Sequence, residues 1–376
     1  MILKDSVKYA LQDLAVVPEA VSAIRHRSQC SPYVSFCKKM YLPLITAPME
    51  SVVSQFNYKV FEDNDIISVI PRTKTNPIDV RMKLCSEVFC AFSLDEALNY
   101  FTTDGNIWTN KEIPDFNGCK ICIDIANGHM QALIETVEKI KELFPNIVIM
   151  TGNIANPKAF FHLAEAGVDL VRVGIGTGSR CTTSSNSAVH YPLASLIEEC
   201  YLSKVEHGYK AKIVADGGIG NFDDIITALA LGADFCMCGN LFAKCIEAYG
   251  GKLVEYRRQD NSINRCFDHP IEYIRNKQLD IYKEFDLTRY KYCREYYGMS
   301  TKRAQELMGI PPEKMRTAEG ISKYVDVEYT LAGWTENFRH YMRNAMSYTS
   351  SFTLDDFIGQ VDLVVLSPTA RAAYFK

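Results

Sequence analysis

Short apolar runs rich in β-branched residues recur along the chain and alternate with longer segments whose apolar residues are spaced three or four positions apart. The short runs are typical of strands that are buried on both faces, as in a parallel sheet covered by helices. Eight such runs occur, at residues 42–46, 66–70, 88–92, 120–125, 147–151, 170–173, 212–215 and 235–238.

The longer segments predict amphipathic helices between most of these strands. Residues 131–143 have the clearest pattern, with apolar side chains on one helical face. Comparable patterns cover 157–166, 192–207 and 223–231, and Gly232 follows the last of them, as a C-terminal glycine should. Eight βα units in roughly 240 residues predict an α/β fold, the TIM barrel. A doubly wound open sheet, built from the same βαβ units, is the alternative.

The residues after the eighth strand predict a C-terminal extension within a single domain spanning residues 1–376. We place the barrel at about 40–250, an insertion at 256–293, and a flap with closing helices at 299–376. Helical patterns are expected around 270–284, 299–307 and 336–347, and the polar stretch 314–329 is expected to be the active-site flap.

Composition narrows the class of protein. Apolar residues make up 47% of the chain and the net charge is −4, which gives no basic field for nucleic acid or an anionic membrane. We expect neither a membrane span nor a signal peptide, and therefore a cytoplasmic protein. The 13 scattered cysteines indicate reduced core thiols. Cys119 and Cys122 form a single CxxC, too little for a zinc or redox prediction.

Polar and glycine-rich segments cluster directly after the predicted strands. In a barrel, all of these segments lie at the carboxyl ends of the strands, where TIM-barrel active sites are built. Their agreement in position favours an enzyme. The segments are 47–50, 124–129, 152–153, 174–183, 216–218 and 239–240.

The most informative of these segments reads Gly174-Ile-Gly-Thr-Gly-Ser-Arg-Cys181-Thr-Thr183. Its glycines allow close backbone approach, and Arg180 with exposed amides would favour the thiolate of Cys181 as a nucleophile. A tight turn beside an inert cysteine is the alternative on spacing alone. The spacing differs from the dinucleotide fingerprint, and 184–187 separate it from a following helix, so a Rossmann site is disfavoured.

Two other segments suggest phosphate binding and acid–base chemistry. Asp216-Gly-Gly218 and Gly239 end the seventh and eighth strands, whose loops often bind phosphate in barrels. Asp216 could accept hydrogen bonds from ribose hydroxyls. Glu319 lies in the flap, where a carboxylate could act as acid or base, or simply be solvated. His129 and His190 receive no role.

The 174–183 loop closely resembles the catalytic loop of the IMP dehydrogenase/GMP reductase family. The resemblance continues in the N-terminal and first-strand motifs and in three later segments, and it covers nearly the whole chain except 256–293. These five segments are 11–18, 47–52, 215–219, 228–234 and 297–299. The family fold is a TIM barrel, in agreement with the strand count.

Three features resemble the GMP reductase branch. No regulatory domain follows the second strand, Asn127 stands where dehydrogenases usually have His, and 299–319 lacks the Arg-Tyr pair of the dehydrogenase flap. The flap instead reads Arg316-Thr-Ala-Glu319-Gly320. The resemblance implies NADPH-dependent reductive deamination of GMP to IMP and ammonia through a covalent adduct between Cys181 and purine C2, with Thr183 and Glu319 supplying the proton to the leaving ammonia.

The resemblance also implies the binding residues and the assembly. It implies K⁺ as a second cofactor besides NADPH, and a homo-oligomer, a tetramer by analogy. The implied nucleotide contacts are Met49, Ser179, Asp216, Gly217, Gly218, Gly239, Asn240, Met299, Ser300, Arg316 and Gly320; the cofactor contacts are Arg72, Asp124, Asn127 and Gly128; and the potassium ligands are the carbonyls of Gly176, Gly178 and Cys181.

The chain departs from the family pattern at several positions, and these leave other functions open. The departures are Pro71, Thr177, Arg180, Asn240, Ile321 and the long 256–293 segment. The alternatives are an IMP dehydrogenase lacking its regulatory domain, a reductase of a related purine or deoxypurine nucleotide, and a purine-nucleotide-binding barrel without catalysis.

Overall fold

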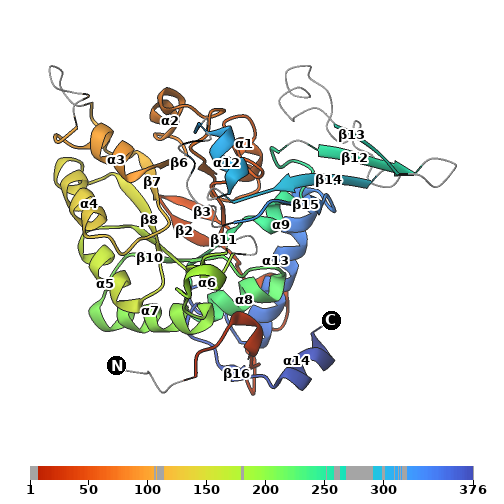
Figure 1. Cartoon of the computed structure of the whole chain (residues 1–376). Coiled ribbons are helices and arrows are strands. Elements are labelled where there is room, and N and C mark those ends of the chain that lie inside the picture. Colours follow the sequence, from red (N-terminus) through yellow and green to blue (C-terminus); the bar gives the residue numbers. More distant parts are fainter. Residues whose placement is uncertain are drawn as a thin grey trace.

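The computed structural model describes residues 7–105, 107, 114–178, 182–250, 252–257, 263–267, 291–298, 301–308, 310–311, 313, 315 and 320–375. Its centre is a sheet of eight parallel strands (Figure 1). The strands are β4 (Leu44–Thr46), β5 (Val69–Ile70), β6 (Phe89–Phe92), β7 (Lys120–Asp124), β8 (Val148–Ile154), β9 (Leu170–Val173), β10 (Lys212–Asp216) and β11 (Phe235–Cys238).

The sheet closes on itself. Each strand pairs with its neighbour in sequence from β5 to β11, and β11 pairs with β4. Ile45 of β4 bridges to Ile67, just before β5, which completes the ring. The predicted TIM barrel is therefore confirmed, and the open doubly wound sheet is excluded because such a sheet has two free edges.

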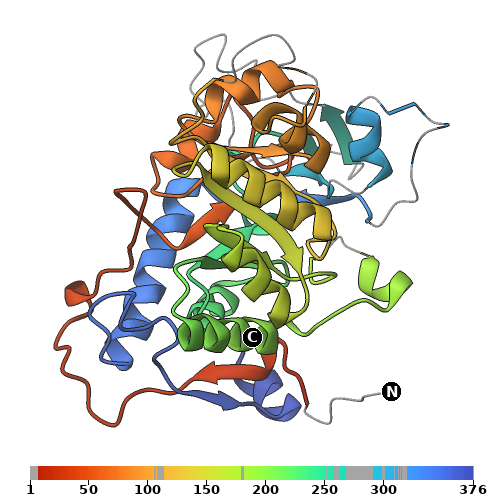
Figure 2. The same ribbon diagram turned by 90° about the vertical axis from the view of Figure 1, so that its left-hand side faces the viewer.

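Helices surround the barrel as the hydrophobic pattern predicted (Figures 1 and 2). The helix predicted at 131–143 has those bounds. Two of the other three differ from prediction by one residue at one end, and the third, predicted at 223–231, differs by one residue at each end. The helices that follow barrel strands are α1 (Tyr58–Glu62), α2 (Ile78–Leu84), α3 (Leu94–Phe101), α4 (Gln131–Leu143), α5 (Pro157–Glu165), α6 (Thr183–Ser187), α7 (Leu193–His207), α8 (Phe222–Ala230) and α9 (Asn240–Ala243).

The closing helix is longer than predicted, and it completes the outer layer of the barrel. This helix, α13 (Leu331–Tyr348), includes the expected 336–347 and begins five residues earlier. Its Trp334 and Phe338 rings stack 5.9 Å apart, and Trp334 also meets Phe222 of α8 and Phe242 of α9. Phe338 is fully buried, so α13 occupies the place of an eighth barrel helix.

The amino ends of the strands are covered by segments that the pattern did not predict. A hairpin of β2 (Val34–Phe36) and β3 (Lys39–Tyr41) places Phe36 against Phe89 and Phe235, at the starts of β6 and β11. The short helices η1 (Leu11–Asp13) and η2 (Arg27–Gln29) lie in the same N-terminal region. Between η1 and η2, β1 (Leu14–Val16) pairs with β16 (Leu363–Val365), which precedes α14 (Pro368–Tyr374).

A second sheet projects from the barrel (Figure 1). Its antiparallel strands are arranged in the order β13 (Ile263–Phe267), β12 (Lys252–Arg257), β14 (Lys291–Tyr296) and β15 (Lys323–Asp326). β15 lies within the stretch predicted as a flap. The predicted helix around 270–284 lies outside the described residues, and the one predicted at 299–307 is α12 (Lys302–Leu307).

Arg294 fastens this second sheet to the barrel. Its fully buried guanidinium on β14 donates to the carbonyls of Ala243, at the end of α9, and of Cys245, Ala248 and Gly250 in the loop that follows. The four carbonyls satisfy the buried donors, and the bonds set where β14 ends relative to the barrel.

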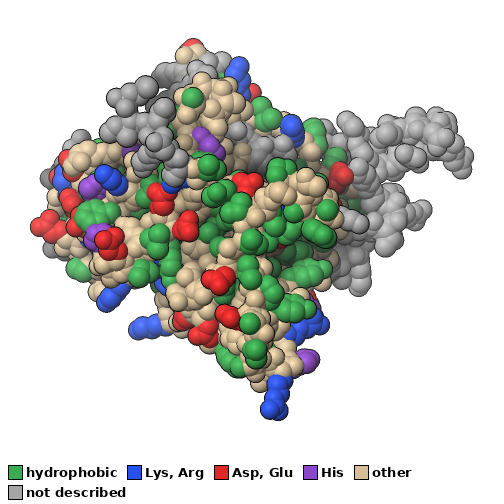
Figure 3. Space-filling model, turned by 90° about the horizontal axis from the view of Figure 1, so that it is seen from below, with side chains coloured by type: hydrophobic (Ala, Val, Ile, Leu, Met, Phe, Trp, Pro, Cys, Tyr) green, Lys and Arg blue, Asp and Glu red, His purple; other side chains and the backbone are tan. Residues whose placement is uncertain are grey.

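The mixed charges on the surface and the free, buried thiols agree with what the net charge and the cysteine count predict. Acidic and basic side chains mix with apolar ones on the face seen from below (Figure 3). No helix among the described residues has the length and apolar character needed to span a bilayer. The eleven cysteines whose side chains the structure describes are free, and all but Cys37 are buried.

Replacing Phe338 by Ala should lower the free energy of unfolding by about 3–5 kcal/mol, because it leaves a cavity among stacked rings. Urea denaturation measures this change. Tyr348→Ala on the same helix is the control and should cost under about 1 kcal/mol, since the Tyr348 side chain is 61% exposed. Equal losses from the two substitutions would contradict the packing of α13.

Candidate active site

A cavity of about 470 Å³ opens at the carboxyl ends of the barrel strands. Its walls come from the end of β8, from the turns after β4, β5, β7, β9, β10 and β11, and from the end of β14, so segments far apart in sequence meet there. Among the predicted site residues, those that line this cavity are Met49, Arg72, Asp124, Gly176, Gly178, Thr183, Asp216, Gly217, Gly218, Gly239 and Asn240.

The remaining predicted residues fall into two groups. Asn127, Gly128 and Gly320 are described but are not among the residues lining this cavity. Gly128 instead borders a smaller cavity of about 190 Å³ with His129, Lys158 and His162. Outside the described residues lie Ser179, Cys181, Met299, Ser300, Arg316 and Glu319.

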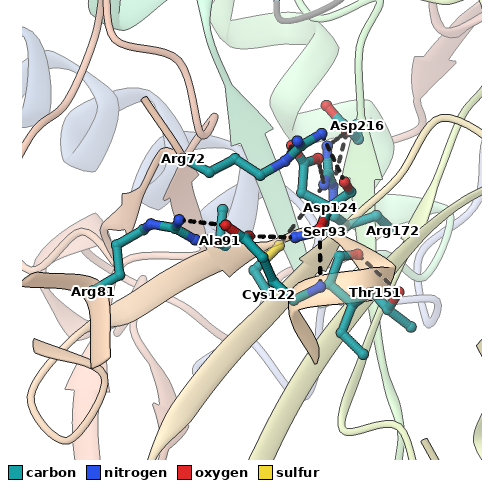
Figure 4. Close-up of polar contacts among 11 residues, drawn as sticks. Arg72, Arg81, Ala91, Ser93, Cys122, Asp124, Thr151, Arg172 and Asp216 are labelled. Atoms are coloured by element: carbon teal, nitrogen blue, oxygen red, sulfur yellow. Dashed lines mark hydrogen bonds and ion pairs between the residues drawn. The ribbon is translucent and has the colours of Figure 1, made fainter. Parts of the chain in front are cut away.

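Arg172 of β9 lies at the centre of the polar contacts in the cavity (Figure 4). Its Nε and Nη2 donate to Oδ2 of Asp216 at 3.1 and 2.8 Å, and its Nη1 donates to Oδ1 of Asp124 at 2.6 Å. The two aspartates are the last residues of β7 and β10, so one guanidinium ties three strands together. The side chain of Arg172 is only 8% exposed.

The charges of this cluster hold one another ionised. Burial acts to raise the pKa of Asp124, but Arg172 and Arg72 outweigh it and hold that pKa below the usual 3.8. Burial likewise acts to lower the pKa of Arg172, but the two aspartates outweigh it and raise the pKa well above its usual value. Beneath them, burial raises the pKa of Cys122 to about 12, so a neutral thiol faces Nη1 of Arg172.

Arg72 approaches the same cluster from the turn after β5. Its Nη2 donates to the carbonyl of Asp124 at 3.4 Å, and its Nε lies 3.9 Å from Oδ2 of that residue. Nε is buried and has no hydrogen-bond acceptor within the described structure. This donor is therefore available to an acceptor group of a bound molecule.

The ends of β8 and β10 and the loop after β9 are bonded to one another around Asp216. Asn153 Nδ2 donates to Oδ2 of Asp216 at 2.7 Å and to the carbonyl of Gly174 at 2.8 Å. Thr177 Oγ1 donates to the carbonyl of Asp216 at 2.8 Å. Gly217 has φ of +90°, and a Cβ there would collide with Thr177 Oγ1, so this contact between loops requires glycine.

Tyr296 reaches the turn after β11 from the end of β14. A Cβ on Gly239 would collide with the Tyr296 hydroxyl and would lie 3.2 Å from Met49 Sδ. Close approach therefore accounts for glycine at position 239. Asn240 follows it, with a buried Oδ1 that has no donor among the described residues. Together these groups form a polar corner of the cavity beside Gly217 and Gly218.

The segment after the predicted nucleophile differs from expectation. Residues 184–187 were expected to separate the glycine loop from any helix, but α6 (Thr183–Ser187) begins there. The prediction was wrong because hydroxyls bond back to the preceding turn: Ser185 Oγ donates to the Thr182 carbonyl and Ser187 Oγ to the Thr183 carbonyl. Ser184 Oγ donates to the carbonyl of Gly176 at 2.9 Å, which anchors α6 to the glycine loop.

Sequence reasoning missed three residues of this cavity: Asn153, Arg172 and Tyr296. Asn153 lies in the polar segment 152–153, to which no role was assigned, and Tyr296 directly precedes the family-like segment 297–299. The signal for Arg172 was a lone charge inside an apolar strand, in 170–173. A buried charge must be paired, so that position predicts partners on neighbouring strands without saying which.

The family model and the similar proteins that match this chain all point to the same family. The model of the IMP dehydrogenase / GMP reductase domain matches residues 112–263. A GMP reductase of Aliivibrio salmonicida is 29% identical over the full length of both chains, and one of Shewanella pealeana is 26% identical, also over both full lengths. A GMP reductase of Caenorhabditis elegans is 28% identical over 72% of this chain and 66% of its own.

A closed βα barrel with glycine turns and paired charges at the carboxyl ends of its strands defines a TIM-barrel protein with its site at the usual face. Within that class, the match over residues 112–263 and the full-length likeness to proteins named GMP reductase support the predicted resemblance to the IMP dehydrogenase/GMP reductase family. The family and the oxidoreductase class predicted from the sequence are thereby confirmed, and the family implies a nicotinamide cofactor.

Arg172→Met should lower the free energy of unfolding by about 3 kcal/mol at pH 7, because the buried carboxylate of Asp124 and the partly buried carboxylate of Asp216 lose their cation. In the wild type, the ionised form of Asp124 adds stability above pH 3.8, which is lost as the pH falls through its depressed folded pKa. In the variant, burial and Asp216 raise that pKa, so the ionised group costs stability as the pH rises. Urea denaturation should therefore give a smaller loss at pH 4.5 than at pH 7.

Two controls accompany this measurement. Arg172→Lys keeps the charge and should restore part of the stability. Arg371→Met breaks the half-exposed pair with Asp223 and should cost under about 1 kcal/mol at either pH. A loss from Arg172→Met that is the same at both pH values would contradict the charge pairing.

Proposed function

We propose that this chain catalyses the reductive deamination of GMP, in which GMP, NADPH and two protons give IMP, ammonium and NADP⁺. The observation that carries the proposal is the joining of three elements in one cavity: the glycine turns after β10 and β11, the paired Asp124 and Asp216, and the loop that leads to Cys181. The full-length likeness to proteins named GMP reductase supports the same reaction.

The cavity suits a nucleoside monophosphate. The amides of Gly217, Gly218 and Gly239 and the hydroxyl of Tyr296 would bind the phosphate, since backbone amides and hydroxyls are its ordinary donors. Arg172 and Asn153 both bond to Oδ2 of Asp216, so Oδ1 of that carboxylate would accept from the ribose hydroxyls. Ser179, Met299, Ser300, Arg316 and Gly320 complete the proposed contacts.

The described residues also fit a nicotinamide cofactor. The orphaned Nε of Arg72 offers a donor beside Asp124, in the same cavity as the proposed phosphate corner. Arg72, Asp124, Asn127 and Gly128 are the proposed contacts. When bound, the cofactor supplies the hydride that C2 receives, and NADPH rather than NADH is our proposal.

A potassium ion is proposed on the carbonyls of Gly176, Gly178 and Cys181. Carbonyl oxygens suit this cation. The carbonyl of Gly176 already accepts from Ser184 Oγ, and a carbonyl oxygen has a second lone pair for the ion. We further infer a cytoplasmic homo-oligomer, a tetramer by analogy with the family.

The chemistry assigned to this chain's side chains is nucleophilic and acid–base catalysis. The Cys181 thiolate would attack C2 of GMP, and donors around the ring would stabilise the charge that develops there. Thr183 and Glu319 would deliver a proton to the 2-amino nitrogen, which leaves as ammonia. After C2 has been reduced, the C2–sulfur bond breaks and Cys181 leaves as the thiolate, giving IMP.

Incubation with GMP and NADPH should consume the cofactor and release one ammonium per NADPH, followed by absorbance at 340 nm and an ammonium assay. Incubation with IMP and NAD⁺ should leave the absorbance unchanged. Growth of absorbance in the second mixture would instead support an IMP dehydrogenase. If neither mixture changes in absorbance or releases ammonium while GMP still binds, the result would support a nucleotide-binding barrel without catalysis. Repeating the first incubation with dGMP in place of GMP tests the deoxynucleotide alternative.

Cys181→Ala should abolish turnover, a loss of at least about 10⁴-fold, because no other group forms the adduct. Glu319→Gln should keep GMP affinity but release ammonium about 10²–10⁴-fold more slowly, since the general acid is lost. Cys37→Ala is the control, because Cys37 is the exposed free thiol outside the cavity, and it should keep full activity. Ammonium release from Glu319→Gln at the wild-type rate would contradict the assigned acid.

A further inference from the structure

The N-terminal segment 8–16 crosses the barrel beside the glycine turn that follows β10. Lys8 Nζ bonds to Glu199 Oε1 and the amide of Tyr9 to Ser195 Oγ, both on α7. After η1, β1 pairs with β16, so the segment is fastened at both ends. Between these anchors, Gln12 points its side chain at residues 218–224.

Gln12 and Asp224 together hold this turn. Gln12 Nε2 donates to the carbonyl of Gly218 at 3.2 Å and to Oδ1 of Asp224 at 2.6 Å. Oδ2 of Asp224 accepts from the amides of Gly220 at 2.8 Å and Asn221 at 3.2 Å. Asp224 is 2% exposed, so its carboxylate is a fixed hub rather than a solvated side chain.

These bonds decide which amides of the turn face the cavity. In a trans peptide the C=O and the next N–H point in opposite directions. The carbonyl of Gly218 points at Gln12, which does not line the cavity, whereas Ile219 does. The N–H of Ile219 is therefore directed away from Gln12, toward the cavity. The amides of Gly220 and Asn221 are already used, while those of Gly218 and Ile219 have no acceptor among the described residues.

The chemical type of residue 12 matters for this arrangement. The carbonyl of Gly218 and the carboxylate of Asp224 are both acceptors, so the group between them must donate to both, and a primary amide carries two N–H donors on one nitrogen. A carboxylate at this position would leave both acceptors unpaired and would face Asp224 as a like charge.

We propose that Gln12 is a positioning residue for phosphate recognition: it orients the Gly218–Ile219 peptide so that its N–H points at the phosphate of the bound nucleotide. Gln12 touches no ligand itself and acts through the turn. The inference rests on the proposed function, because it takes the cavity to bind a nucleoside monophosphate. It makes the N-terminal segment part of the binding site, 206 residues away in sequence from the turn that it orients.

The test is the affinity of the full chain for GMP and for guanosine, which lacks the phosphate, by isothermal titration calorimetry. Gln12→Met keeps the length of the side chain and removes both donors. It should weaken GMP binding about tenfold, as expected for lost hydrogen bonds to a charged ligand, and leave guanosine binding unchanged. Gln12→Glu should weaken GMP binding at least as much.

Lys8→Met is the matched control, because it removes the anchor of the same segment to α7 without touching the turn. It should leave both affinities unchanged. A wild-type preference for GMP over guanosine that survives in Gln12→Met overturns the positioning role alone. Equal weakening of GMP and guanosine overturns it too, because the effect would then be general. A wild type without preference for GMP would overturn both this inference and the proposed function.

Discussion

The structure of the site depends on one buried guanidinium. Arg172 is charged and almost wholly removed from water, which is costly unless carboxylates compensate it. Asp124 and Asp216 do so from the ends of β7 and β10, on either side of its own strand region, and each uses one oxygen for the purpose. The pairing therefore fixes the side chains of three strands and leaves Oδ1 of Asp216 without a donor among the described residues.

Hydrogen bonds to this cluster hold the loops of the cavity in position. Asp216 also bonds to Asn153 through its side chain and to Thr177 through its carbonyl, so the end of β8 and the loop after β9 are tied to the end of β10. Beyond Asp216, the glycine turn is fixed on its outer side by Gln12 and Asp224. Binding groups placed on strand ends and braced turns lose little entropy when a ligand binds, which favours precise recognition.

The sequence predicted the barrel well because its signals are local. Buried strands and amphipathic helices appear as short-range periods, and residues 131–143, 170–173 and 235–238 have the predicted bounds. Partners were not predictable where they are distant along the chain: Arg172 lies 48 residues from Asp124 and 44 from Asp216, and β1 pairs with β16 across most of the chain. No period in a single sequence records such pairings.

The residues proposed for binding and those proposed for catalysis also differ in how far the fold fixes their position. The predicted site residues that line the cavity, such as Asp124, Asp216 and Gly239, stand at the ends of strands, where the fold itself decides their position. Motif resemblance alone supports the roles of Cys181 and Glu319, which lie outside the described residues. In a barrel of this kind, the strand ends can therefore position the binding groups while the loops determine which reaction is catalysed. A reductase and a dehydrogenase must differ at the flap carboxylate, because one adduct loses ammonia and the other gains water.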